Sequence, residues 1–459
     1  MTVEQSVNAA GDVFTMDPGQ VPRHWYNILP DLDIEVPEPA RGPSSAPLSG
    51  EGHPIQPQLP LSMFRQARSR SRFVEIPEPV RAQYQRWRPT PLYRATRLER
   101  ELGTPAHIYF KYEGTSPSGS HKLNTALPQA YYYQRSGIRE IVTGTGAGQW
   151  GSALAMACRP YGIGCTVFMV RCSYEQKPYR GVLMRLNGAR VLLSPSEETE
   201  VGRAALRADP DTPGSLGIAN AEAIEYANSR PGARFSIGSG ENHVLLHQTV
   251  IGEEALTQMA MAGEFPDVVI GAMGAGSNFA GLTFPFYRAA KAENAGTRFV
   301  AVEPEACPKM TRGRYLMDHT DYSGVTPMVK MYTLGHKFTA YHIHAGGLRY
   351  HGAAPIVSAM YDKGLVEAVS YGQTRVFEAG VAFAKAEGIV PAPESAHAVA
   401  CAIDEALEAR RRQSRRVILF GLSGHGLLDL GAYEKYLSGE IVDSAPSDAD
   451  IQASLRSLE

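Results

Sequence analysis

The segment DVVIGAMGAGSNFAG, residues 267–281, carries the clearest structural pattern in the chain. Its first six residues form a short apolar run typical of a buried strand, and a helix is predicted to begin at Asn278. The turn between them is rich in Gly and Ala, so its backbone N–H groups can close on a phosphate at the positive end of the helix dipole. It lacks the Lys and Ser/Thr of a nucleotide-binding P-loop and fits the GxGxxG spacing poorly. Taken alone, it is equally well explained as a tight strand-to-helix turn without a ligand.

From residue 106 onward the chain repeats this alternation of short apolar strands and longer amphipathic helices. Further strands are predicted at HIYFKYE (107–113), REIVTG (139–144), CTVFMV (165–170), ARVLLS (189–194), RFVAVEP (298–304) and RVILFG (416–421). Further helices are predicted at residues 122–136, 150–161, 177–187 and 243–262. The alternation indicates βαβ units, hence an α/β fold whose ligands bind beyond the carboxyl ends of parallel strands.

These elements divide into two α/β domains with a cleft between them. The predicted boundaries are an N-terminal extension (1–72), an N-terminal α/β domain (73–245), a C-terminal α/β domain (246–440) and a polar tail (441–459). The extension is dense in Pro, Gly and Ser and shows no helical or strand periodicity, so it is expected to be loop-like. Trp25 and Tyr26 are its candidate anchors, and we expect it to wrap the body.

Composition excludes several classes of function. The 459 residues include 45 Lys+Arg and 47 Asp+Glu, a net charge of 45 − 47 = −2, which gives no electrostatic basis for binding nucleic acid or membrane surfaces. No apolar stretch approaches the roughly 20 residues that span a bilayer, and the first residues do not resemble a signal peptide, so a cytoplasmic protein is expected. The five cysteines form no CxxC pair and are expected to be reduced and buried.

The segment SGSHKLNTA, residues 118–126, places a lysine at the start of an otherwise apolar helix. Burial and the helix dipole both disfavour the charged form of Lys122, so its pKa is expected to fall, as a Schiff-base amine requires. His121 and Asn124 flank it. A snorkelling surface lysine is the alternative for this segment taken alone.

Two further segments complete the pattern. TGTGAGQWGSA (143–153) is another strand, Gly-rich turn and helix, and the N–H groups from Thr145 to Gln149 suit an anionic carboxylate. In LFGLSGHGLLDL (419–430), Ser423 ends a strand and can face a cofactor ring. Lysine, phosphate turn, carboxylate turn and strand-end serine together indicate a pyridoxal phosphate site.

From about Trp25 to about Tyr436 the chain resembles the tryptophan synthase beta chains, which are fold-type II pyridoxal phosphate enzymes. It is most similar to the second beta-chain type. The motifs that carry the resemblance are WYNILPDLD (25–33), WRPTPLYRA (87–95), VRCSYEQKPYR (170–180), CPKMTRGRY (307–315), HAGGLRYHG (344–352), PAPESAHA (391–398) and LSGHG (422–426).

The resemblance implies a role for each motif residue. Lys122 would bind the cofactor covalently, with His121 and Asn124 beside it and Glu394 near the ring. Ser423 would hydrogen-bond the pyridine nitrogen. The phosphate would be held by Gly274, Ala275, Gly276, Ser277 and Asn278. The substrate carboxylate would be bound by Thr145, Gly146, Ala147, Gly148 and Gln149.

One departure from the family bears on catalysis. Family members read Glu-Thr-Gly-Ala-Gly-Gln where this chain has Gly144 before Thr145, so the family's catalytic carboxylate is missing. General acid/base help is typically worth 10²–10⁴-fold in rate, so the loss should matter. We consider two explanations. Glu241, in SIGSGENHV (236–244), takes over the role in space left by Gly144, or the enzyme uses a better leaving group or a nucleophile that needs no base. A solvated helix-cap role is the plainer reading of Glu241.

The resemblance predicts β-elimination and β-replacement on L-serine with indole or an indole-like nucleophile, giving L-tryptophan. The alternatives are a related reaction on threonine, O-acetylserine or O-phosphoserine, and a non-catalytic protein that binds pyridoxal phosphate. Arg349 would contact the substrate carboxylate or a leaving phosphate, or form a structural salt bridge. His243 and His247 lie one helical turn apart without a third ligand, so no metal is expected. The resemblance also implies a homodimer without a tight alpha-subunit partner.

Overall fold

A computed structural model describes residues 11–40, 58–322, 324 and 326–458. Its larger sheet has seven strands in the order β1-β4-β5-β15-β10-β11-β14. These strands are β1 (Val13–Phe14), β4 (Leu92–Arg94), β5 (His107–Tyr112), β15 (Val417–Leu422), β10 (Val268–Ala272), β11 (Arg298–Pro304) and β14 (Glu367–Tyr371). The strands from β5 to β14 are parallel, and β1 and β4 add an antiparallel edge.

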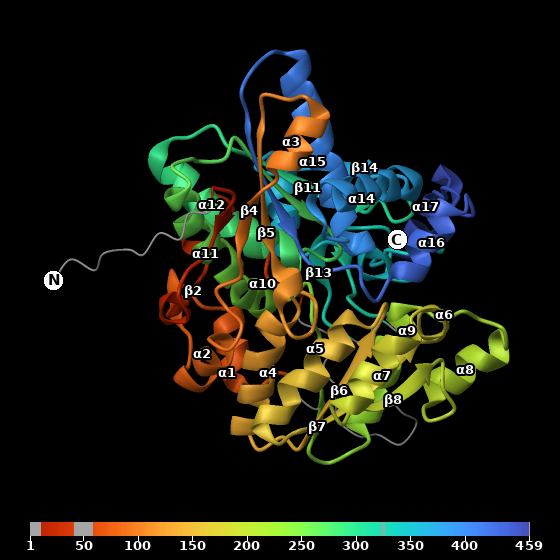
Figure 1. Ribbon diagram of the computed structural model, residues 1–459. Helices are drawn as coiled ribbons and strands as arrows, with labels where there is room; N and C mark the ends of the chain where they lie inside the picture. Colours follow the sequence, from red (N-terminus) through yellow and green to blue (C-terminus); the bar gives the residue numbers. More distant parts are fainter. Residues whose placement is uncertain (1–10, 41–57, 323, 325, 459) are drawn as a thin grey trace.

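The smaller sheet is wholly parallel, with the order β8-β7-β6-β9, and lies in the lower half of Figure 1. Its strands are β6 (Glu140–Thr145), β7 (Gly164–Val170), β8 (Arg190–Ser194) and β9 (Ala233–Phe235). The predicted strands at 139–144, 165–170 and 189–194 are confirmed within a residue or two. A largely parallel sheet and a wholly parallel sheet, with helices between their strands, confirm the α/β prediction.

The sheets do not follow the expected domain boundary. The predicted strand 107–113 was assigned to the domain of residues 73–245, yet β5 pairs in parallel with β15, along the register His107 to Val417. The larger sheet therefore contains strands from both ends of the chain. A single sequence shows that β5 is a strand, but its partner is set by long-range packing that local periodicity does not contain.

Helices follow the strands and present their N-termini at the carboxyl ends of the sheets. Those that carry the site are α4 (Leu123–Arg135), α5 (Gln149–Cys158), α9 (Leu216–Asn228), α10 (Asn242–Gln248), α11 (Val250–Met261), α12 (Ser277–Glu293) and α15 (Pro393–Arg411). The predicted helix 243–262 is two helices, which meet at Thr249. The Thr249 hydroxyl accepts a hydrogen bond from Tyr26 N at 2.9 Å and donates one to Leu246 O at 2.7 Å. This side-chain bonding to the backbone competes with the helical pattern.

The remaining strands form two antiparallel pairs outside the two larger sheets. The strands are β2 (His24–Tyr26), β3 (Phe73–Glu75), β12 (Arg314–Asp318) and β13 (Val329–Thr333). The helices are α1 (Leu61–Ala67), α2 (Glu78–Tyr84), α3 (Thr96–Leu102), α6 (Arg171–Gln176), α7 (Pro178–Leu186), α8 (Glu200–Ala208), α13 (Pro355–Asp362), α14 (Gln373–Glu387), α16 (Leu430–Leu437) and α17 (Asp448–Leu455).

The N-terminal extension is anchored as predicted. Trp25 and Tyr26 are fully buried, and the Trp25 ring packs on the His247 ring with centroids 4.5 Å apart. The expectation that residues 1–72 are loop-like throughout is wrong for Leu61–Ala67, which form α1. Residues 1–10 and 41–57 lie outside the described part of the chain.

Both faces of the larger sheet are buried, which explains its continuous apolar strands. On β10, Val268 and Ile270 pack in one hydrophobic cluster and Val269 in another, as side chains alternate across the sheet. All five cysteines are unpaired, and all but Cys172 are buried. Among the described residues, no helix is both long and apolar enough to cross a membrane.

Candidate active site

Turns that follow strands of both sheets line a single cleft. They are residues 144–147 and Gln149 at the end of β6, Ala272 and residues 274–278 after β10, and residues 423–425 after β15. Lys122 and Glu394 also line it. The cleft therefore lies beyond the carboxyl ends of the parallel strands, where the α/β pattern predicts a ligand site.

Lys122 directly precedes α4, and its side chain reaches the cleft. Nζ donates hydrogen bonds to Gly238 O at 2.7 Å and to Ser277 Oγ at 3.0 Å. Burial lowers the pKa of Lys122 to about 8, against the opposing effect of the Glu394 carboxylate. The direction of this pKa shift is the expected one. At pH 8 about half of the amine is uncharged, and the uncharged amine is the form that can act as a nucleophile.

His121 lies between the lysine and the two turns of the larger sheet. Its Nε2 is 3.2 Å from Ser277 Oγ, and its Nδ1 is 3.3 Å from Ser423 O. Burial, reinforced by the charge of Lys122, lowers the pKa of His121 to about 3. The imidazole is therefore neutral at physiological pH, and it adds no positive charge beside the lysine.

The turn before α12 is shaped for an anion. Gly276 has a φ of 121°, which disfavours any residue with a side chain, and a Cβ on Gly274 would lie 2.7 Å from Gly347 O. Ser277 is the first residue of α12, so the N–H groups of that helical turn have no intrahelical partner. Behind the turn, the buried Lys309 ammonium donates to Met273 O at 3.2 Å. These features fit a phosphate group.

Ser423 follows β15, and its hydroxyl is held by a second serine. Ser423 Oγ lies 2.7 Å from Ser395 Oγ, which also accepts a hydrogen bond from Gly424 N at 3.0 Å. Ser395 was not among the predicted site residues, although it sits beside Glu394 in the motif PAPESAHA. A neutral hydroxyl, not a carboxylate, thus occupies this side of the cleft.

Glu394 connects Gln149, in the turn after β6, with the backbone of Gly347. Its Oε1 accepts hydrogen bonds from Gln149 Nε2 at 2.9 Å and from Gly347 N at 2.8 Å. Its Oε2 is buried and has no hydrogen-bond partner among the described residues. A buried oxygen without a partner costs about 1–3 kcal/mol, so a bound group is expected to satisfy it.

The turn predicted to bind a carboxylate reaches the cleft through Thr145, Gly146, Ala147 and Gln149. Gly148 does not line the cleft. It adopts a φ of 96° as the residue that precedes α5, and a Cβ there would lie 2.9 Å from Arg180 Cδ. Its role is to turn the chain so that the N–H groups at the start of α5 face inward.

Glu241 does not line the cleft, although its charge lies close enough to Tyr350, which does line it, to add to the burial that raises the pKa of that phenol. The residues of its segment that line the cleft are Ile237, Gly238 and Ser239. The chain then turns at Gly240, with a φ of 81°, and Glu241 precedes α10 as its N-terminal flanking residue. Burial raises the pKa of Glu241.

The expectation that Gly144 leaves room for a relocated carboxylate is wrong. A Cβ on Gly144 would lie 2.4 Å from Asn220 Oδ1, 2.7 Å from Asn220 N and 2.8 Å from the carbonyl carbon of Ala219. Helix α9 therefore fills the space beside Gly144 with both side chain and backbone. Nothing in the local sequence around 220 indicates this contact.

Two other predicted site residues lie outside the cleft lining. Arg349 does not line it, and its buried Nε has no hydrogen-bond partner in the described ranges. Asn124 is fully buried away from the cleft, where it accepts a hydrogen bond from Arg88 Nη1 at 2.7 Å and donates to Glu113 Oε2 at 2.9 Å. Within the described residues, no three His, Cys, Asp or Glu side chains are placed to hold a metal ion.

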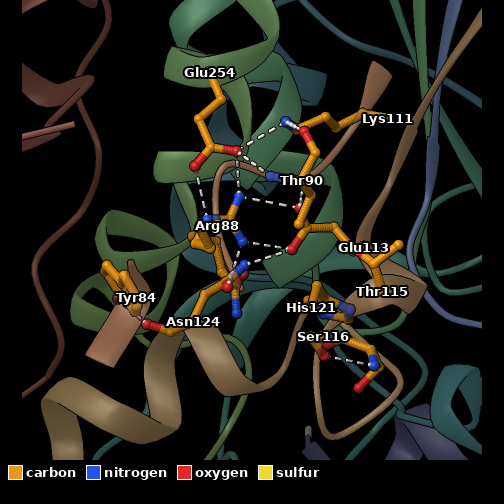
Figure 2. Close-up of polar contacts among 12 residues, drawn as sticks. Tyr84, Arg88, Thr90, Lys111, Glu113, Thr115, Ser116, His121, Asn124 and Glu254 are labelled. Carbon is orange, nitrogen blue, oxygen red and sulfur yellow. Dashed lines mark hydrogen bonds and ion pairs between the residues drawn. The ribbon is translucent and has the colours of Figure 1, made fainter. Parts of the chain in front are cut away.

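Asn124 belongs to a buried ion network that the sequence analysis missed (Figure 2). Arg88 lies at its centre, 2.9 Å from Glu113 Oε2 and 2.8 Å from Glu254 Oε1. Lys111 Nζ is 2.8 Å from Glu254 Oε2, so two cations balance two carboxylates. Because Asn124 is two residues beyond Lys122, the network fixes the start of α4 and with it the position of the lysine.

Comparison with known proteins agrees with this geometry. Residues 84–424 match the family model described as "Pyridoxal-phosphate dependent enzyme". The chain is 54% identical over 436 residues to tryptophan synthase beta chain 2 of Pyrococcus abyssi, covering 95% of this chain and 98% of that protein. It is 55% identical over 443 residues to tryptophan synthase beta chain 2 of Aeropyrum pernix, covering 95% and 97%.

Among solved structures, the processed form of threonine deaminase isoform 2 from Solanum lycopersicum has a similar fold. The TM-score is 0.58 at 16% sequence identity, and the match covers 87% of this chain and 98% of that chain. At this level of identity the likeness concerns the fold alone.

Proposed function

Since the chain belongs to the pyridoxal-phosphate dependent enzymes, and within them to the tryptophan synthase beta chains, we propose that it joins L-serine and indole into L-tryptophan. It is a lyase that uses pyridoxal phosphate. The observation that carries the proposal is the Lys122 amine, buried and hydrogen-bonded to Ser277 Oγ at 3.0 Å, at the mouth of the phosphate-shaped turn. A lysine amine next to an anion-binding turn suits a cofactor that carries both an aldehyde and a phosphate group.

Each part of the cleft receives a role in this proposal. The turn formed by Gly274, Ala275, Gly276, Ser277 and Asn278 would hold the phosphate, and the Ser423 hydroxyl would hydrogen-bond the pyridine nitrogen. When bound, pyridoxal phosphate supplies an electron sink that acidifies the Cα–H bond of an amino acid. Lys122 then takes and returns that proton, because its uncharged amine is abundant near pH 8.

The substrate carboxylate binds the turn after β6, where Thr145, Gly146 and Ala147 precede the N-terminus of α5. Gln149 closes this turn through its hydrogen bond to Glu394 at 2.9 Å. His121 is neutral and orients Ser277 by hydrogen bonding, since its pKa of about 3 excludes the charged form. Because the Ser423 hydroxyl carries no charge, it would not stabilise a proton on the pyridine nitrogen, which would favour β-elimination and replacement over transamination.

The test is product formation by the purified protein loaded with pyridoxal phosphate. We expect L-tryptophan from L-serine and indole, detected by chromatography, and no product from Lys122→Ala. Parallel reactions with threonine, O-acetylserine and O-phosphoserine identify the preferred donor. Product from one of these donors at a kcat/KM well above that of L-serine would overturn the choice of L-serine. No product from any donor would overturn the proposed reaction.

The assembly and compartment belong to the same proposal. The resemblance to the second beta-chain type supports a homodimer that acts without a tightly bound alpha subunit, and light scattering of the purified chain tests this. Five unpaired cysteines are typical of a reducing compartment, which supports a cytoplasmic location.

A further inference from the structure

Asn220 is a polar side chain in the cleft whose amide has no partner. It lies on α9, is 3% exposed and lines the cleft. Among the described residues, nothing hydrogen-bonds to its side-chain oxygen or nitrogen. Neither amide atom is among the fully enclosed unpartnered atoms, so the small exposed part of the side chain faces the cleft that Asn220 lines. A molecule bound in the cleft can therefore hydrogen-bond to this amide.

The position of this amide is fixed by Gly144. The Asn220 Oδ1 atom lies 2.4 Å from where a Cβ on Gly144 would stand, and the Asn220 backbone N lies 2.7 Å from it. Only a residue without a side chain allows α9 to approach the end of β6 this closely. The amide is thereby held next to Thr145, which begins the turn proposed to bind the substrate carboxylate.

The surroundings of the amide indicate what it binds. Leu216 lies one helical turn before Asn220 and lines the cleft on the same face of α9. Ile237 and Trp150 also line the cleft, and the Trp150 N–H already donates to Thr143 Oγ1 at 2.7 Å. Apolar walls with one unpartnered amide match a flat apolar ring that carries a single N–H group.

We propose that Asn220 determines nucleophile specificity by accepting the N–H hydrogen bond of indole through Oδ1, while Leu216 packs against the ring. This inference rests on the proposed function, because it names the residue that recognises the second substrate. A carboxamide donates and accepts hydrogen bonds but does not exchange protons at physiological pH. Asn220 is therefore a specificity residue, and proton transfer is left to Lys122, which lines the same cleft.

The experiment compares indole with indene, which has a similar two-ring shape but no N–H group. Calorimetric titration of the pyridoxal phosphate-loaded protein measures the Kd of each. We expect the wild type to bind indole at least about tenfold more tightly than indene, because a site built to hydrogen-bond a ligand N–H rejects the analogue that lacks it. We expect Asn220→Leu, which keeps the side-chain size but removes the amide, to bring the two Kd values together.

Asn220→Asp is the second variant, since it keeps an acceptor oxygen at the same place. We expect it to retain the preference for indole over indene. Both variants should show the wild-type absorption spectrum of the bound cofactor and the wild-type spectral change on adding L-serine, which separates this test from that of the proposed reaction. An indole preference that survives in Asn220→Leu, or a wild type that binds indene as tightly as indole, would overturn the role of Asn220.

Discussion

Replacing Glu254 by glutamine tests how firmly the buried ion network holds the start of α4. The Glu254 carboxylate is fully buried and accepts hydrogen bonds from Arg88 at 2.8 and 2.9 Å, from Thr90 N at 3.1 Å and from Lys111 at 2.8 Å. Glutamine leaves two buried cations with only Glu113 as counter-charge. Because breaking a buried ion pair by removing one partner costs about 3–5 kcal/mol, we expect the free energy of unfolding to fall by that amount.

The preceding residue provides a matched control. Glu253 pairs with Arg288 at 2.6 Å, with side chains that are 20% and 22% exposed, so Glu253→Gln should cost about 0–1 kcal/mol. Urea unfolding followed by far-UV circular dichroism measures the free energy of unfolding of the wild type and both variants. Equal losses in the two variants, or a loss below about 1 kcal/mol in Glu254→Gln, would refute the reasoning.

Three further predictions follow from the site and its supports. Although burial opposes its ionisation, the Arg88 guanidinium lowers the pKa of Glu113 to about 2, below its ordinary value of 4.5. Its stabilising contribution is therefore full above pH 4.5 and lost as the pH falls towards 2, which acid titration of the circular dichroism signal measures. Gly144→Ala forces a Cβ to within 2.4 Å of Asn220 Oδ1, so we expect the free energy of unfolding measured in urea to fall by about 1–3 kcal/mol. Gly296→Ala is the control, because a Cβ there meets nothing within 4 Å and the residue has no positive φ, and it should change the free energy of unfolding by less than about 0.5 kcal/mol. Covalent uptake of pyridoxal phosphate by the cofactor-free protein should quicken as the pH rises through about 8, because burial lowers the pKa of Lys122 to that value; a rate that does not change between pH 6 and 9 would contradict this.

Local sequence patterns were enough to locate the strands, turns and helices that carry the predicted cofactor-binding residues. The segment from β10 through its Gly-rich turn to α12 combines a buried strand, a turn and a helix in sequence, so short-range rules locate it almost to the residue. Lys122, Ser277 and Ser423 lie at such element ends, and the structure brings all three to the cleft. Their meeting place follows from the parallel topology.

Long-range contacts account for what the sequence did not reveal. The pairing of β5 with β15 joins residues about 300 positions apart, and the Arg88 network joins a loop residue to Glu254 on α11, far along the chain. Asn220 sits in an ordinary helical stretch, and only the packing of α9 on Gly144 turns it into a cleft residue. The sequence also did not show that a left-handed glycine, Gly240, turns the chain directly before Glu241, which does not line the cleft.

The central claim is that Lys122 binds pyridoxal phosphate in the cleft between the two sheets. Reduction of the cofactor-loaded protein with sodium borohydride makes the lysine bond permanent, and peptide mass spectrometry then locates it. We predict a pyridoxyl phosphate label on the peptide that contains Lys122. A label on another buried lysine, such as Lys111 or Lys309, or no label on any peptide, would contradict the account.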